Sequence, residues 1–151
     1  MENKIFLVFI SIFIFLILVS FLFLTKQPPK KWGRACFQEY CFDVKLAQNG
    51  IEKTKGLMFQ KYLEQNKGML FFFDKESIYP FWMKNTYIPL DIIWMNKNYK
   101  VVFISENNQP CKWHNCPLIE PPTDAKYVLE VNSGIVQKIR LKLADELNLT
   151  Y

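Results

Sequence analysis

The sequence predicts a mainly β domain with short helices, an α+β fold that is compact and either barrel-like or a sandwich, behind one N-terminal transmembrane helix. Three observations support this prediction. Residues 5–24 form an uncharged apolar run, the remaining chain breaks into apolar segments of strand length, and turn signals separate these segments. The chain has 151 residues, half of them hydrophobic and 22% charged, which indicates one folded domain and excludes a disordered protein.

The apolar run 5–24 has 20 residues, of which only Ser11 and Ser20 are polar. As a helix rising about 1.5 Å per residue it spans about 30 Å, the thickness of the hydrocarbon core. A cleaved signal peptide is the alternative, but the run is long and no small-residue cleavage site precedes the basic residues that follow. The sequence therefore predicts a single-pass anchor in the lipid bilayer of the cell membrane. Residues 1–4 flank this anchor, a basic linker with two prolines follows at 25–35, and the domain occupies 36–151.

The net charge of +5 is concentrated in the linker, where Lys26, Lys30, Lys31 and Arg34 lie. Residues 35–151 hold 14 Lys or Arg against 13 Asp or Glu. Nucleic-acid binding needs a basic face on the domain, so no nucleic-acid partner is predicted. Taken alone, the positive charges after the anchor place the domain in the cytoplasm.

The four cysteines form two pairs with the same spacing, Cys36 with Cys41 and Cys111 with Cys116. Such pairing favours two local disulfides in an oxidising compartment. A zinc site with His114 as a further ligand is an alternative, although structural zinc sites usually have two to four residues between paired cysteines. Four unpaired thiols are the third possibility. We expect disulfides and no metal, and hence a domain on the extracytoplasmic side, in conflict with the charge rule.

Alternation and apolar runs define the elements of the domain. A loop with four prolines occupies 106–125, and Asn132-Ser133-Gly134 is a turn or helix cap. Strands are predicted at 41–47, 68–73, 81–87, 89–95, 100–105 and 125–131, and short helices at 51–63, interrupted by Gly56, and at 135–141.

Several of these segments carry motifs of a known family. They are Lys55-Gly-Leu-Met58, Gly68-Met-Leu-Phe71, Phe81-Trp-Met-Lys-Asn-Thr86 followed by Pro89-Leu-Asp91, and Tyr127-Val-Leu-Glu-Val-Asn132 followed by Gly134. Over about residues 40–147 the chain resembles the prokaryotic domain-of-unknown-function family number 192. The resemblance implies a small, mainly β domain that is often exported or tethered by an N-terminal segment, with no established activity. The chain departs from the family at Arg140 and Ala144, where glycine is frequent, which bears on the geometry of the C-terminal turn.

The segment 81–91 is the candidate ligand-binding site. On an extended chain Trp82, Lys84 and Thr86 share one face, with Asn85 and Asp91 close by. A cation, an amide, a hydroxyl and a carboxylate beside an aromatic wall suit a small polar ligand such as a sugar, a peptide or an anionic small molecule. In the structural alternative, Lys84 pairs with Asp91 while Asn85 and Thr86 bond the backbone.

Glu130 interrupts an apolar strand and lies on the face opposite Tyr127, Leu129 and Val131. If that face points inward, Glu130 needs a partner such as Lys84; otherwise it is a solvated carboxylate. The sequence has no recognised catalytic signature and indicates no cofactor. It predicts a ligand-binding or accessory module of the cell envelope. The alternatives are an envelope hydrolase using Asp91 and Glu130 with Lys84 as charge stabiliser, and a purely structural envelope protein.

Overall fold

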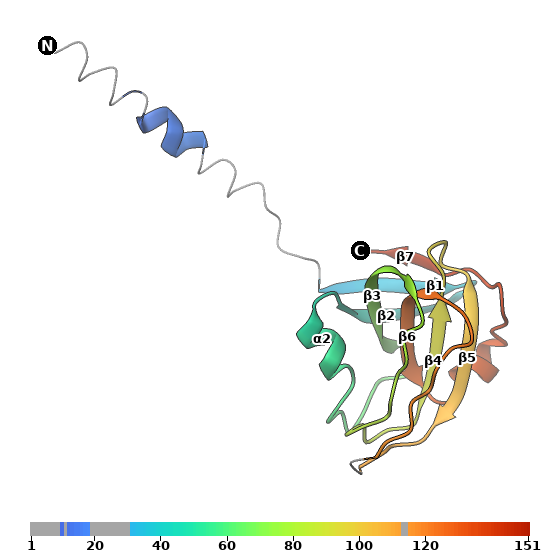
Figure 1. Cartoon of the computed structure of the whole chain (residues 1–151). Helices are drawn as coiled ribbons and strands as arrows, with labels where there is room; N and C mark the ends of the chain where they lie inside the picture. Colours follow the sequence, from blue (N-terminus) through green and yellow to red (C-terminus); the bar gives the residue numbers. More distant parts are fainter. Residues whose placement is uncertain (1–9, 11, 19–30, 113–114) are drawn as a thin grey trace, which may run out of the picture.

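A computed structural model of the chain describes residues 10, 12–18, 31–112 and 115–151. The described residues from 31 onward fold around a seven-stranded sheet with the order β5-β4-β6-β3-β2-β1-β7 (Figure 1). All neighbouring strands are antiparallel except β2 and β3. The elements are β1 (Trp32–Phe37), β2 (Tyr40–Ala47), α2 (Gly50–Lys55), β3 (Lys67–Ser77), β4 (Leu90–Met95), β5 (Val101–Asn108), β6 (Ala125–Asn132), α3 (Ile135–Ile139) and β7 (Asn148–Thr150).

The sheet buries apolar side chains on both faces, which explains why its central strands appear in the sequence as nearly continuous apolar runs. All six residues of β4 are buried. One face packs Ile93 and Leu129 against α3. The other face packs Ile92 and Trp94 against the chain that follows α2 and against the loops on either side of β4 and β5. This second face carries the candidate site.

The prediction of a compact, mainly β domain is confirmed, but in the described residues the barrel-like or sandwich arrangement is replaced by one sheet that is not closed. Its edge strands β5 and β7 do not pair with each other, and only an isolated bridge joins Lys100 to Glu146 near them. The reason is that β7 has only three residues, all of which pair with β1. Loops and α2 cover the second face of the sheet instead, so a compact domain forms without closure.

The strand predicted at 81–87 is wrong, since this segment makes only isolated bridges, from Phe81 to Ile119 and from Lys84 to Cys111. The chain cannot stay extended because Asn85 has a φ of 57° and the backbone N–H of Thr86 donates to the carbonyl of Met83. The other predicted strands are present, and β3 continues to Ser77. The helix predicted at 51–63 stops at Lys55, just before Gly56. Strands β1 and β7 were not predicted.

Both predicted disulfides are present. Cys36–Cys41 crosses the hairpin of β1 and β2, where the two cysteines are cross-strand partners, and Cys111–Cys116 lies within the long loop before β6. No cysteine is free. Among the described residues no group of three or more potential ligands could hold a metal ion. The alternatives of unpaired thiols and a four-cysteine zinc site are therefore wrong.

The predicted anchor 5–24 lies largely outside the described residues. Its described part, residues 10 and 12–18, is helical and exposed. No helix within the described ranges is long and apolar enough to cross a membrane. The anchor therefore stays a prediction from the sequence. Strand β1 begins at Trp32, inside the segment assigned to the linker.

The C-terminal turn, where the chain departs from the family pattern, contains two residues in the left-handed region. Arg140 has a φ of 56° and Ala144 a φ of 70°. A side chain in this conformation costs about 1 kcal/mol relative to glycine. Ala144 is exposed, and its N–H donates to the carbonyl of Val101. The turn therefore forms without glycine but stores backbone strain.

We expect the substitution Ala144→Gly to raise the free energy of unfolding by about 0.5–1 kcal/mol, because glycine relieves this strain. Urea unfolding followed by tryptophan fluorescence measures the change. The matched control is Ala35→Gly in β1, where φ is not positive and the alanine is buried, so the same change should destabilise the fold. A loss of stability in Ala144→Gly would contradict the account of the turn.

Candidate ligand-binding site

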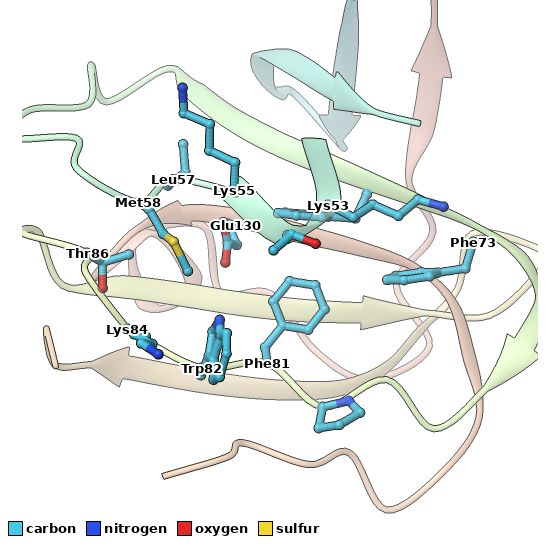
Figure 2. Close-up of a pocket in the computed structure, with 14 residues that line it drawn as sticks. Lys53, Lys55, Leu57, Met58, Phe73, Phe81, Trp82, Lys84, Thr86 and Glu130 are labelled. Carbon is cyan, nitrogen blue, oxygen red and sulfur yellow. The ribbon is translucent and has the colours of Figure 1, made fainter. Parts of the chain in front are cut away.

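An open pocket of about 430 Å³ lies between α2, the segment 80–86 and strands β3 and β6, on the second face of the sheet (Figure 2). Its walls are mainly aromatic, with Phe71 and Phe73 from β3 and Phe81 and Trp82 from the segment 80–86. The ring of Phe81 packs edge-on against Phe71, with centroids 4.9 Å apart. Trp82 is 40% exposed at the mouth of the pocket. The size and the lining suit a small molecule.

Helix α2 forms one side of the pocket because its two ends are well defined. At its start Asn49 accepts from the N–H of Glu52, whose carboxylate accepts from the N–H of Asn49, a capping box. At its end Gly56 has a φ of 47°, and a Cβ there would lie 3.4 Å from Phe71 and 3.7 Å from Oε2 of Glu130. Glycine therefore lets the chain turn sharply over the floor of the pocket.

Glu130 forms the floor of the pocket. Its side chain is 4% exposed, and Oε2 has no hydrogen-bond partner among the described residues. Burial raises the pKa of this carboxyl to about 8, although a hydrogen bond from the backbone of Leu57 opposes the shift. At neutral pH the carboxyl is therefore mostly protonated and can donate a hydrogen bond. In Figure 2 the nitrogen-bearing edge of the Trp82 ring faces Glu130 across the pocket.

Three lysines contribute to the pocket lining, Lys53 and Lys55 from α2 and Lys84 from the segment opposite. In Figure 2 the ammonium ends of Lys53 and Lys55 extend away from Glu130, so their positive charge lies at the rim of the pocket. Nζ of Lys53 lies 5.0 Å from the ring centre of Phe73, and Nζ of Lys84 lies 5.1 Å from that of Trp82. Within the described residues, none of the three makes an ion pair. The expected pairs of Lys84 with Glu130 or with Asp91 are therefore not formed, and the three ammonium groups carry uncompensated positive charge around an apolar cavity.

The structure places Thr86 in the pocket lining but uses its hydroxyl locally, since Oγ1 donates to the carbonyl of Met83. Asn85 is not in this pocket. It lines a neighbouring hollow with Tyr87 and Lys112. Its backbone joins two parts of the site, because its carbonyl accepts from the N–H of Phe59 at 2.7 Å and its own N–H donates to the carbonyl of Cys111.

Asp91 lies on the other face of the sheet. In the β4–β6 register Glu130 is opposite Ile92 and Asp91 is opposite Val131, and directly opposite residues point to the same face. The Asp91 carboxylate is fully buried and accepts from the N–H of Asn107 at 2.8 Å and of Val136 at 3.0 Å. Asp91 therefore joins β5 to the first turn of α3. It cannot act on one bond together with Glu130, as the hydrolase alternative requires.

Almost the whole folded part of the chain is similar to known proteins. The family model DUF192, described as "Uncharacterized ACR", matches residues 34–149. The chain belongs to the DUF192 family. Among curated proteins nothing matches this DUF192 domain.

Two solved structures are similar to this DUF192 domain, each with 29% sequence identity. One is a protein of unknown function from Novosphingobium aromaticivorans, with a TM-score of 0.70, 78% of this chain covered and 83% of that chain. The other, from Sinorhizobium meliloti, is named a "putative transcription regulator", with a TM-score of 0.71, 82% of this chain covered and 95% of that chain.

Of the predicted site residues of this DUF192 domain, Trp82, Lys84, Thr86 and Glu130 meet in one pocket, whereas Asn85 and Asp91 do not. Sequence reasoning missed the contributions of α2 and β3. Two family motifs, Lys55-Gly-Leu-Met58 and Gly68-Met-Leu-Phe71, contained the signal, because Lys55, Gly56 and Phe71 all line the pocket. Their role follows only once the sheet register brings β3 and β6 together.

Proposed function

We propose that this DUF192 domain is a membrane-tethered, extracytoplasmic binding module of the cell envelope, whose pocket binds a small molecule consisting of a sugar ring with an acidic group. The observation that carries the proposal is the buried carboxyl of Glu130 at the floor of an open pocket, whose Oε2 has no hydrogen-bond partner in the part of the chain that the structure describes. A buried polar atom without a partner is unfavourable, and a ligand hydroxyl would satisfy it.

The lining of the pocket supports a ring-shaped ligand. The exposed indole of Trp82 and the ring of Phe81 line the pocket, and the flat face of the indole is a surface on which the C–H face of a sugar can pack. The indole N–H and the carboxyl of Glu130 face each other across the cavity, so that both can bond hydroxyls of one ring (Figure 2).

The charges around the pocket support an acidic substituent. Lys53, Lys55 and Lys84 line the pocket without a carboxylate partner among the described residues. Glu130, the one acidic residue of the lining, is largely neutral at pH 7 because burial raises its pKa to about 8. The net field of the pocket therefore favours an anion such as a carboxylate or a phosphate.

Two features support the proposed location. Disulfides such as Cys36–Cys41 and Cys111–Cys116 persist in oxidising compartments outside the cytoplasm. The uncharged run 5–24 is long enough to span a bilayer. The proposal does not include DNA binding, which the name of the Sinorhizobium structure suggests for that protein. In the folded domain that the structure describes, α2 and α3 have only six and five residues, which is too short for the recognition helix of a DNA-binding motif.

Saturation-transfer NMR on the full chain in a mild detergent tests the ligand class. We expect saturation to reach glucuronate and glucose 6-phosphate, whereas neutral glucose binds at least about tenfold more weakly because it lacks the charge-assisted hydrogen bonds. The substitution Trp82→Ala should weaken binding of the acidic sugars by about tenfold, since it removes the stacking surface.

The matched control is Trp32→Ala, because Trp32 is also exposed but lies outside the pocket. This variant should bind like the unchanged chain. Equal binding of glucose and glucuronate, or binding that survives Trp82→Ala, would contradict the proposed ligand class.

A further inference from the structure

The charges of the domain are polarised toward the side that carries the pocket mouth. The segments 50–62, 80–90 and 109–118 together hold five lysines and one acidic residue, Glu52. The rest of residues 35–151 holds nine Lys or Arg against twelve Asp or Glu. The near-neutral total therefore conceals an excess of positive charge in these three segments.

Exposed apolar side chains interleave with these lysines. Ile51 is 83% exposed and Phe59 56% exposed, and both line a shallow, mainly apolar hollow beside α2. The ring of Phe59 packs edge-on against the ring of Tyr87, with centroids 6.2 Å apart. Nζ of Lys112 lies 5.8 Å from the ring centre of Tyr87. Lys61 lines the next hollow with Tyr87 and Lys112. We call this continuous surface, formed by Ile51, Phe59, Lys61, Tyr87 and Lys112, the α2 face.

The chain that leads to the predicted anchor reaches the domain next to the α2 face. The carbonyl of Lys31 accepts from the N–H of Leu46, and Trp32 pairs with Lys45, so the first residues of β1 lie beside the end of β2. Helix α2 begins at Gly50, shortly after that end, and Figure 1 shows it beside the start of β1. The six residues 25–30 can extend to about 20 Å at most, which keeps this side of the domain near the end of the apolar run 5–24.

Lysines interleaved with aromatic and aliphatic side chains are the composition that binds a membrane interface. Aromatic rings pack at the level of the headgroups, and lysines near an anionic surface attract its lipids. We propose that the α2 face docks onto the anionic headgroups of the bilayer that holds residues 5–24, so that the pocket mouth opens toward the membrane surface. This inference rests on the proposed anchor and not on the ligand of the pocket.

Photo-crosslinking of the full chain in lipid nanodiscs tests the docking. Benzoylphenylalanine replaces Phe59, and in a matched variant it replaces Leu143, an apolar residue that is 62% exposed and lies outside the α2 face. A third variant carries it in place of Phe15, as a reference for lipid contact within the predicted anchor. The nanodiscs contain either phosphatidylcholine alone or phosphatidylcholine mixed with phosphatidylglycerol, and mass spectrometry identifies the adducts.

We expect position 59 to give phosphatidylglycerol adducts and position 143 to give few. Combining Lys61→Gln with Lys112→Gln should lower the docking constant by about twenty-fivefold, because each lysine near an anionic surface contributes about fivefold. These two lysines do not line the pocket, so binding of glucuronate should stay unchanged and the two proposals fail independently.

Three results would overturn the inference. Lipid adducts at position 15 with none at position 59 would mean that the α2 face points away from the bilayer. Absence of lipid adducts at both positions would remove the anchor on which the inference rests. Adducts at position 59 that join two copies of the chain would assign the face to a protein interface.

Discussion

Replacing Glu130 by Gln is expected to raise the free energy of unfolding by about 3 kcal/mol at pH 7, because the unchanged protein bears the cost of a carboxyl that cannot ionise in its buried site. The pKa of Glu130 is about 8 in the folded state against 4.5 for an exposed glutamate. Each unit of difference corresponds to about 1.4 kcal/mol of linkage between protonation and folding. Glutamine keeps the shape and a hydrogen-bond donor without the ionisation.

The pH dependence identifies the cause of this effect. The raised pKa means that the folded state holds a proton which the unfolded state releases above about pH 4.5. The contribution of Glu130 to stability is therefore greatest below pH 4.5, falls as the pH rises toward 8, and is constant at still higher pH. The stability gained by Glu130→Gln should therefore be smallest below pH 4.5, grow as the pH rises toward 8 and stay constant above it, which urea unfolding at several pH values measures.

The matched control is Glu106→Gln, an exposed glutamate of β5, which should change stability by less than about 0.5 kcal/mol. A stability difference for Glu130→Gln that does not depend on pH would contradict the assignment. The gain in stability should be accompanied by weaker binding of acidic sugars, as is common when a site residue is removed.

Replacing Asp91 by Ala is expected to lower the free energy of unfolding by about 4 kcal/mol while leaving the affinity of the remaining folded protein for glucuronate unchanged. The carboxylate accepts from two backbone N–H groups, that of Asn107 in a partly buried contact and that of Val136 in a buried one. Each hydrogen bond to a charged group contributes about 1.5–3 kcal/mol, and alanine leaves both donors without a partner. The expected loss of stability thus comes from the two hydrogen bonds that join β5 and α3 to Asp91 of β4.

Asp91→Asn keeps one acceptor and should cost about half as much. Asp74→Ala, at an exposed position of β3, is the control for loss of a strand carboxylate. Urea unfolding measures stability, and saturation-transfer NMR with glucuronate measures binding. If the variant Asp91→Ala folds with unchanged stability but no longer binds glucuronate, the structural role of Asp91 would be contradicted and Asp91 would belong to the binding site.

The sequence was sufficient for the elements whose apolar pattern is local. Strands β2, β4 and β6 follow from alternation and apolar runs. The helix predicted over 51–63 was too long, since α2 ends at Lys55. Strand β7 was missed because it forms by pairing between the two ends of the domain, with Leu149 opposite Ala35, which local patterns do not indicate. Strand β1 was missed although it pairs along its length with the neighbouring strand β2, because its first residues were assigned to the linker. The choice between a barrel-like domain and a sandwich rested on the strands and turn signals, which do not show whether the two edges of a sheet pair.

The site was half predictable for a related reason. Trp82, Lys84 and Thr86 were grouped on the assumption of an extended chain, yet they share the pocket through a turn. The assignment of Asp91 failed because only the pairing of Ile92 with Glu130 shows that the two carboxylates point to opposite faces. The lysines of α2 could not be found from sequence because the position of α2 over β3 and β6 depends on the fold of the whole sheet.

One wall of the pocket is held in shape by a covalent bond elsewhere in the chain. The N–H of Cys111 donates to the carbonyl of Met83 at 3.0 Å, and the N–H of Asn85 donates to the carbonyl of Cys111 at 2.8 Å. Cys111 is itself fixed by its disulfide to Cys116. Under the function proposed above, we expect reduction of this disulfide to loosen the segment that carries Trp82 and Lys84. The oxidised chain should then bind a ligand more tightly than the reduced chain, because less of this wall has to be ordered on binding.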